Sequence, residues 1–193
     1  TRGQTPLHCV ARSGNVASIK TVLNLYPKSE WMQVVSKKGA EGEILLHCAA
    51  CSGNIESIKA ILAVYPASNH LQAVNLEDDD GRTVLHRVAE SGNVESLKFI
   101  LSLYTESEHL YALNFRNKSD LAVLRRAVSL GNVECFKSTL DLFPESERLR
   151  AVQMQDDYGE TALHQAAYSS DPQVIDIILA LYPESERLEA LLM

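Results

Sequence analysis

Apolar residues recur in this chain with the spacing of an amphipathic helix. Val16, Ile19, Leu23 and Tyr26 fall at i, i+3, i+7 and i+10. This spacing places all four side chains on one face of a helix with about 3.6 residues per turn. An apolar face of this kind has to be buried against another element, so the pattern predicts a packed helix that follows Asn15.

The flanking residues are typical helix starts and stops. A shorter apolar segment, residues 5–13, ends at Gly14, which takes the left-handed C′ conformation without a Cβ penalty. Asn15 then serves as the N-cap of the longer helix. Four further residues hold the same N-cap position in later copies of the pattern: Asn54, Asn93, Asn132 and Asp171. Pro172 follows the last of these at N1, where its missing N–H costs nothing.

The whole pattern repeats every 39 residues, as five leucines show: Leu7, Leu46, Leu85, Leu124 and Leu163. Cuts before Gly39, Asp78, Asn117 and Asp156 divide the chain into five units: residues 1–38, 39–77, 78–116, 117–155 and 156–193. We number these units one to five. Nothing is left over for a second domain, so we predict a single repeat domain.

Each unit has a third segment after its helix pair. It is clearest as Pro-Glu-Ser-Glu-Arg-Leu at residues 144–149 and again at residues 183–188. Pro at the start, acids in the first turn and Arg later suit the helix macrodipole, so we predict a two-turn helix. The predicted fold is therefore all-α: a solenoid of five stacked units, each with a helix pair, a loop tip and an extra short helix.

The loop tip and first helix carry a known signature. Residues 3–8, read Gly-Gln-Thr-Pro-Leu-His, resemble the ankyrin repeat signature, as do residues 81–86 and 159–164. The alanines that follow fit it too: Ala11, Ala50, Ala89 and Ala167. The resemblance identifies the chain as a long ankyrin variant, since the usual period is about 33 residues. HEAT and armadillo arrays, with periods of about 40 to 47, are the structural alternative, and the Thr-x-Leu-His signature argues against them.

A long-period ankyrin array of this kind also resembles the repeat proteins that intracellular bacteria deliver into host cells. This second resemblance implies a bacterial effector that works in the host cytoplasm. We expect the natural protein to continue beyond both ends of this chain, because neither end has a polar capping repeat.

Four histidines recur at one position of the unit, where a metal or catalytic role has to be weighed: His8, His47, His86 and His164. The ankyrin resemblance implies instead a structural hydrogen bond with the Thr three residues earlier. Unit four lacks both partners and has Ala122 and Arg125 in their place, while unit two keeps His47 beside Ile44. We predict a structural role for these histidines, since buried polar groups need partners.

Cys48 and Cys51 form a Cys-x-x-Cys pair next to His47. Such a pair can bind zinc or exchange disulfides, and zinc or redox sensing is one hypothesis for this chain. Zinc needs about four ligands, however, and the sequence has no second Cys pair. We therefore predict apolar packing for Cys48, a surface position for Cys51, and no metal or cofactor.

Composition narrows the functional classes. Against 25 acidic residues there are 18 Lys and Arg, and the net charge of -7 disfavours nucleic acid and anionic membranes as partners. No apolar run approaches the roughly 20 residues of a membrane span. Four cysteines are few for this length and favour a reducing compartment, so we expect a cytoplasmic protein. No catalytic motif occurs, and the acids are assigned to caps, loops and solvated helix faces.

Positions that vary between units on the concave side are free to encode a partner. The ankyrin resemblance places that side on the loop tips and on the exposed positions of the first helix. The predicted partner-binding residues are Asp79, Asp80, Arg82, Glu90, Leu121, Leu130, Asp157, Tyr158, Glu160 and Tyr168. Their apolar members would anchor a partner and their acids would select a basic surface. Alternatively, Leu121 and Leu130 pack locally in unit four.

The predicted function is a monomeric protein-binding scaffold without catalysis of its own. The alternative is a substrate-recruiting domain of a larger enzyme, whose catalytic domain lies outside this chain.

Overall fold

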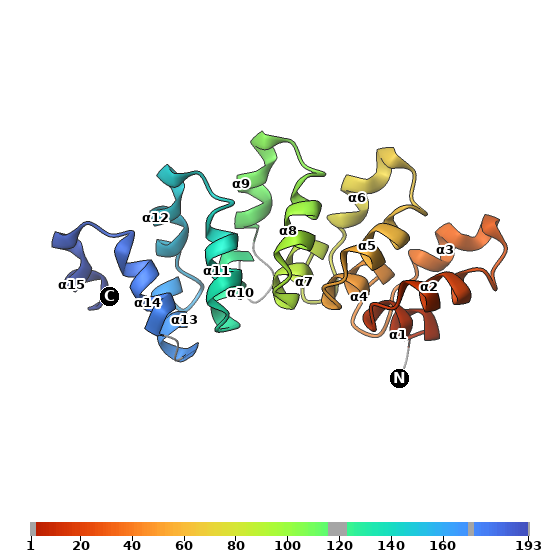
Figure 1. Cartoon of the computed structure of the whole chain (residues 1–193), viewed down its shortest axis with the longest axis horizontal. Helices are drawn as coiled ribbons and strands as arrows, with labels where there is room; N and C mark the ends of the chain where they lie inside the picture. The colour runs from red at the N-terminus through yellow and green to blue at the C-terminus, as the bar shows by residue number, and fades with distance from the viewer. Residues whose placement is uncertain (1–2, 116–122, 170–171, 193) are drawn as a thin grey trace.

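A computed structural model describes residues 3–115, 123–169 and 172–192. These residues form an arched row of helices that come in successive triplets (Figure 1). Each triplet has an inner helix, an outer helix and a third segment. The inner helices lie along the concave side of the arch, and α3, α6, α9 and α12 lie along the opposite side. No strand occurs in the described ranges, which confirms the all-α helical repeat.

The inner helices are α1 (Pro6–Arg12), α4 (Leu45–Cys51), α7 (Val84–Ser91), α10 (Val123–Ser129) and α13 (Ala162–Ser169). The outer helices are α2 (Val16–Leu23), α5 (Ile55–Leu62), α8 (Val94–Leu101), α11 (Val133–Leu140) and α14 (Pro172–Ala180). The third segments are η1 (Lys28–Glu30) with α3 (Trp31–Val35), η2 (Ala67–Asn69) with α6 (His70–Val74), α9 (Glu106–Asn114), α12 (Glu145–Gln153), and η3 (Glu184–Glu186) with α15 (Arg187–Ala190).

The third segments differ in their first turn. In units three and four the segment is one α-helix of 9 residues, as predicted. In units one, two and five a 3-10 turn comes first and leads directly into a short α-helix. A tighter first turn of this kind is common at helix N-termini, so the predicted two-turn helix is present there in modified form.

The recurring leucines of the inner helices form the centre of the core. All five are buried, and each inner helix packs against the next one in the row. The aromatic residue that follows each outer helix is also buried in units two to five: Tyr65, Tyr104, Phe143 and Tyr182. One continuous hydrophobic cluster therefore runs through the described part of the array.

The predicted caps and histidine bonds are confirmed where they are described. Asn15, Asn54, Asn93 and Asn132 each accept a backbone N–H at the start of an outer helix, while Asp171 lies outside the described residues. The three expected Thr–His pairs are formed: Thr5 with His8 (2.7 Å), Thr83 with His86 (2.9 Å) and Thr161 with His164 (3.0 Å). The histidines thus belong to the framework of the repeat.

A second recurring bond ties the third segment to the outer helix. A planar N–H donor five residues after the aromatic residue donates to the carbonyl oxygen of that residue. The pairs are Trp31 with Tyr26, His70 with Tyr65, Arg148 with Phe143 and Arg187 with Tyr182, at 3.1 to 3.2 Å. Three residue types thus perform one structural task, which depends only on a planar N–H.

We predict that unit four has the lowest local stability among units two, three and four. In units two and three a serine hydroxyl donates to the glycine carbonyl of the preceding unit, from Ser57 (2.7 Å) and Ser96 (3.1 Å). Cys135 takes this place in α11, and unit four also lacks the Thr–His pair. Amides in α10 and α11 should therefore exchange faster than those in α4, α5, α7 and α8 by hydrogen exchange with mass spectrometry. Equal protection of these helices would contradict the prediction.

Candidate functional site

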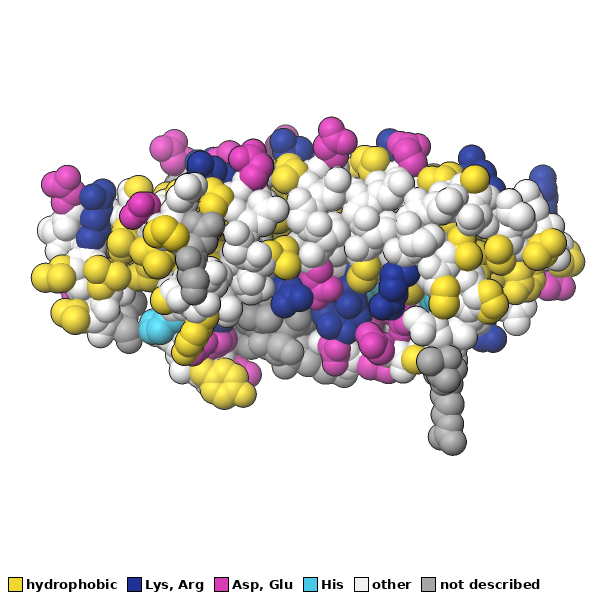
Figure 2. Space-filling model, turned by 60° about the horizontal axis from the view of Figure 1, so that its bottom comes forward, with side chains coloured by type: hydrophobic (Ala, Val, Ile, Leu, Met, Phe, Trp, Pro, Cys, Tyr) yellow, Lys and Arg dark blue, Asp and Glu magenta, His cyan; other side chains and the backbone are white. Residues whose placement is uncertain are grey.

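The concave side carries the loop tips and the exposed positions of the inner helices (Figure 1). Figure 2 turns this side toward the viewer and shows Arg, Asp and Glu side chains gathered near its middle, with apolar side chains toward both ends. The surface therefore has two parts that need separate descriptions: a charged centre and an apolar end in unit five.

A backbone hydrogen bond closes the loop tips of units two, three and five. In the tips that are described in full, the N–H of the first residue donates to the carbonyl of the fifth: Gly39 to Glu43 (2.7 Å), Asp78 to Arg82 (3.0 Å) and Asp156 to Glu160 (3.0 Å). Neighbouring tips are also joined, because the N–H of Asp79 donates to the carbonyl of Glu41 at 2.9 Å. The tips of units two and three are thus connected through their backbones.

A carboxylate fills the centre of each closed tip. Asp78 accepts, through Oδ1, the N–H groups of the second and fourth residues after it, at 3.0 and 2.9 Å. Asp156 does the same at 2.9 and 2.8 Å. Gly39 holds this place in unit two, and there Glu43 supplies the carboxylate, whose Oε2 accepts the N–H of Glu41 at 2.7 Å. The carboxylate that accepts the N–H groups of the tip can thus come from the first residue of the tip or from the fifth.

The space left by Gly39 makes this substitution feasible. A Cβ at Gly39 would lie only 2.7 Å from Cδ of Glu43, so a side chain there would displace the carboxylate. Glu43 and Asp78 are both buried. The sequence interpretation, which assigned every acid to caps, loops and solvated helix faces, missed their burial.

Every tip carboxylate is paired with an arginine, and the arginines come from different positions of the unit. Arg12 contacts Glu43 (3.4 Å), Arg87 contacts Asp78 (2.6 Å) and Arg125 contacts Asp156 (2.6 Å). Arg125 occupies the position of the recurring histidine, so the residue that breaks the signature in unit four reaches the tip of unit five. The pairing compensates charges that would otherwise be buried alone.

The ion pairs of units two to four extend into a network, which we call the ionic band. Arg82 pairs with Asp78 (2.9 Å), Asp80 and Glu41 (3.7 Å). Arg87 adds pairs to Glu41 (3.5 Å) and Glu90 (3.2 Å), and Glu90 continues to Arg126 (3.5 Å). Burial opposes ionisation of Asp78, but the hydrogen bonds from Arg82 and the charge of Arg87 outweigh it and hold the pKa of Asp78 below its usual range.

The predicted partner-binding residues divide between the two parts of the surface. Asp80, Arg82 and Glu90 belong to the ionic band, and Asp79 lies exposed beside it. Two of the acids that were expected to face a partner, Asp80 and Glu90, are therefore matched by arginines of the chain itself. Leu121 lies outside the described residues.

The apolar end in unit five is strongly exposed. Tyr158 at the tip is 90% exposed and Tyr168 on α13 is 71% exposed; Leu130, which follows α10 in the neighbouring unit four, is 39% exposed. The Tyr168 hydroxyl donates to Glu160 Oε1 at 3.2 Å, which brings two predicted residues together. Asp157 lies exposed next to Tyr158. Two aromatic rings and one aliphatic side chain are thus available to a partner.

The thiols of the Cys-x-x-Cys pair are poor ligands and nucleophiles in this environment. Burial raises the pKa of Cys48 to about 11, against the opposing effect of Arg12, and burial also raises the pKa of Cys51. Cys48 is buried as predicted, whereas Cys51 is half-buried. Within the described ranges no three His, Cys, Asp or Glu side chains are grouped as a metal site would require.

Comparison with known families identifies the repeat. A family model described as ankyrin repeats (3 copies) matches residues 30–110, and one described as ankyrin repeats (many copies) matches residues 124–179. Together the two matches cover most of the chain. A search of individual curated proteins gives no match. None of the described helices is long and apolar enough to cross a membrane.

Proposed function

The chain belongs to the ankyrin repeat family, and from this premise we propose that it is a scaffold that receives a partner protein on its concave side. Ankyrin repeats are generally protein-binding modules and are typically not catalytic. The observation that carries the proposal is the exposure of Tyr158 and Tyr168 on that side. Aromatic side chains of this kind dominate interface energetics when a partner buries them.

The ionic band is proposed to act as a rigid, charged platform next to these anchors. Its arginines and acids already satisfy one another, so a partner gains little by pairing with them. Acids outside the band are better placed to select a basic partner surface, and Asp157 is such a residue because no ion pair among the described residues includes it. Exposed charges of this type mainly alter the association rate and its dependence on salt.

A crosslinking experiment tests where the partner lies. A photoreactive amino acid, p-benzoylphenylalanine, is placed at Tyr168, and in a control protein at Leu25, which is 78% exposed and follows an outer helix. We expect one protein from the native cells to crosslink at position 168 and not at position 25. Crosslinking at position 25 alone would overturn the assignment of the concave side.

Affinity measurements with that purified protein then test the anchors. Tyr168→Ser introduces the residue of unit four, Ser129, and Leu130→Ser introduces the serine that the other units have. Both changes therefore respect the repeat. We expect each to weaken binding by about 2 kcal/mol in calorimetry, and Leu25→Ala to leave it unchanged. Unchanged affinity in both serine variants would refute the anchor role.

Several predictions from the sequence accompany this proposal and remain predictions. They are the five unit boundaries, a monomeric state, a cytoplasmic location, the effector resemblance, and the alternative role as a recruiting domain of a larger enzyme.

A further inference from the structure

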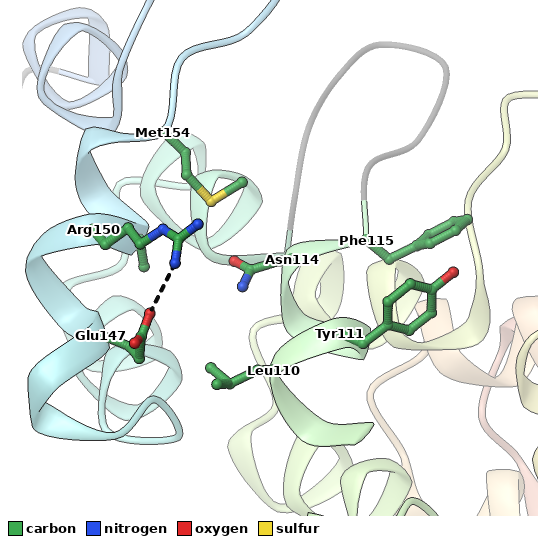
Figure 3. A pocket seen from close by; sticks show the side chains of 8 residues that line it. Leu110, Tyr111, Asn114, Phe115, Glu147, Arg150 and Met154 are labelled. Carbon is green, nitrogen blue, oxygen red and sulfur yellow. Dashed lines mark ion pairs between the residues drawn. The ribbon is translucent and has the colours of Figure 1, made fainter. Parts of the chain in front are cut away.

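The third segments leave clefts between successive units. The larger of two central clefts, about 770 Å³, lies between α9 and α12, and Figure 3 shows Leu110 and Asn114 facing Arg150 and Met154 across it. The smaller one, about 290 Å³, lies on the other side of α9, toward unit two. The third segments supply most of the lining, and the N-cap of α7, Thr83, adds to the smaller cleft. Neither cleft includes the exposed anchors Tyr158 and Tyr168 of the concave site proposed above.

The smaller cleft has an unusual lining. Three aromatic residues and one acid line it: Tyr104, Tyr111, Phe115 and Glu77. Tyr111 and Phe115 also line the larger cleft, so they stand between the two. Figure 3 shows Tyr111 and Phe115 side by side and turned away from α12. Their ring centroids are 6.0 Å apart and the planes are tilted by 57°. The two rings thus form a wall of the cleft rather than a packed core pair, and Tyr111 is 69% exposed.

Two of the aromatic residues are held in place by framework bonds. The Tyr104 hydroxyl donates to Asn75 Oδ1 at 2.6 Å. The carbonyl oxygen of Phe115 is 3.0 Å from His86 Nε2, and the two rings meet edge to face at 6.1 Å. The recurring histidine of unit three therefore positions Phe115, and the cleft is formed before any ligand arrives.

Comparison between units shows that these residues are not needed for stacking. The positions of Tyr111 and Phe115 are held by Gln72 and Leu76 in unit two and by Arg150 and Met154 in unit four. The position of Glu77 is held by Lys38 in unit one. The corresponding cleft between units one and two is lined by Gln72 and Leu76 instead of the two rings. Of these clefts in the described residues, the one between units two and three has three aromatic residues beside an acid. The larger cleft has two aromatic residues with Glu147, which pairs with Arg150 at 3.8 Å, and the cleft near Tyr182 has one aromatic residue with Glu186 and Glu189.

We propose that this cleft binds the cationic side chain of an arginine or lysine from a partner protein. The faces of aromatic rings attract cations, and a neighbouring carboxylate adds a charge of the right sign. No ion pair among the described residues uses the Glu77 carboxylate. Lys38 Nζ donates to the backbone carbonyl of Glu77 at 3.4 Å, so this lysine bonds the main chain of Glu77.

Blocked tripeptides test the proposal directly. The probes are acetyl-Gly-Xaa-Gly-amide with arginine, lysine or norleucine at Xaa, titrated into the isotope-labelled chain and followed by NMR. The arginine and lysine probes are expected to shift the signals of Glu77, Thr83 and Ala112, which line the smaller cleft and not the larger one, together with those of Tyr111 and Phe115, which line both. Norleucine has the length of lysine without the charge, so it is expected to leave these signals unchanged at the same concentration.

Repeat-matched variants locate the binding. Tyr111→Gln and Phe115→Leu introduce the residues of unit two, and Glu77→Gln removes the charge. Each variant is expected to raise the dissociation constant of the arginine probe by about fivefold or more and to leave the thermal unfolding temperature unchanged. Arg150→Gln, in the other cleft, is the control that keeps wild-type binding. Equal shifts with norleucine, no shifts in the cleft, or wild-type affinity in all three variants would overturn the proposal.

Discussion

Replacing Arg87 with alanine is expected to lower the free energy of unfolding by about 3 kcal/mol. The Arg87 side chain is 8% exposed and that of Asp78 is fully buried, with 0% exposure. Asp78 Oδ2 is 2.6 Å from Nη2 and 3.1 Å from Nε of Arg87. Removal of one partner from a buried pair leaves the other charge uncompensated, which typically costs about 3 to 5 kcal/mol. Arg82 remains beside Asp78, so we expect the lower end of this range.

Urea denaturation at neutral pH measures this loss, and Arg126→Ala is the matched control. Arg126 is 36% exposed and makes an ion pair of 3.5 Å with Glu90 in the same band. The Glu90 side chain is 15% exposed, so this pair is only partly exposed, and its loss is expected to cost about 1 kcal/mol, less than that of the buried Arg87–Asp78 pair. Equal losses in the two variants would show that Arg87 acts only as a surface charge.

The part of this fold that could be predicted from sequence is the part that repeats locally. Asn15 and its counterparts, each followed by an apolar stripe, mark the outer helices because capping and periodicity act within one or two turns. The Thr–His pairs are three residues apart, and the family resemblance was enough to foresee them. The structure bears out these elements because each depends on short-range geometry.

Two of the three tip pairs, and the pairs of the ionic band that involve Glu41 or Arg126, could not be predicted in the same way, because they cross between units. Arg12 and Glu43 are 31 residues apart, and so are Arg125 and Asp156. The three tip arginines occupy three different positions of the unit, so no period exposes them. One signal was present in the sequence: unit two has Gly39 where units three and five have Asp, and Glu43 supplies the missing carboxylate.

The smaller cleft, which Tyr104, Tyr111 and Phe115 line, was not predicted from the sequence for a different reason. The rule that variable positions encode partners was applied only to the tips and inner helices, as the ankyrin resemblance suggests. Applied to the third segment, the same rule would have singled out Tyr111 and Phe115, which replace Gln72 and Leu76 of the preceding unit. Segments that lengthen a repeat therefore merit the same comparison between units as its signature positions.

His47 is held in a setting that requires a neutral ring. As in the units that have threonine, Nδ1 accepts the backbone N–H three residues earlier, which here comes from Ile44 at 3.3 Å, and Nε2 donates to the carbonyl of Arg82 at 3.0 Å. Protonation would place a second donor opposite the Ile44 N–H. Burial is the largest cause that lowers the pKa of His47 to about 4, and the charge of Arg87 lowers it further against the opposing effect of Asp78.

Stability should therefore fall by about 3 kcal/mol between pH 6.5 and pH 4 through His47 alone. In this window the unfolded chain, with an ordinary histidine pKa near 6.5, binds a proton that the folded chain excludes. Proton binding therefore favours the unfolded chain increasingly as the pH drops. Urea midpoints at several pH values measure the slope for the wild type and for His47→Gln, whose amide can still donate to the Arg82 carbonyl. The variant should lose stability at neutral pH but show the shallower slope. Parallel slopes would mean that His47 is protonated in the folded chain, and that its bond to Ile44 does not hold in solution.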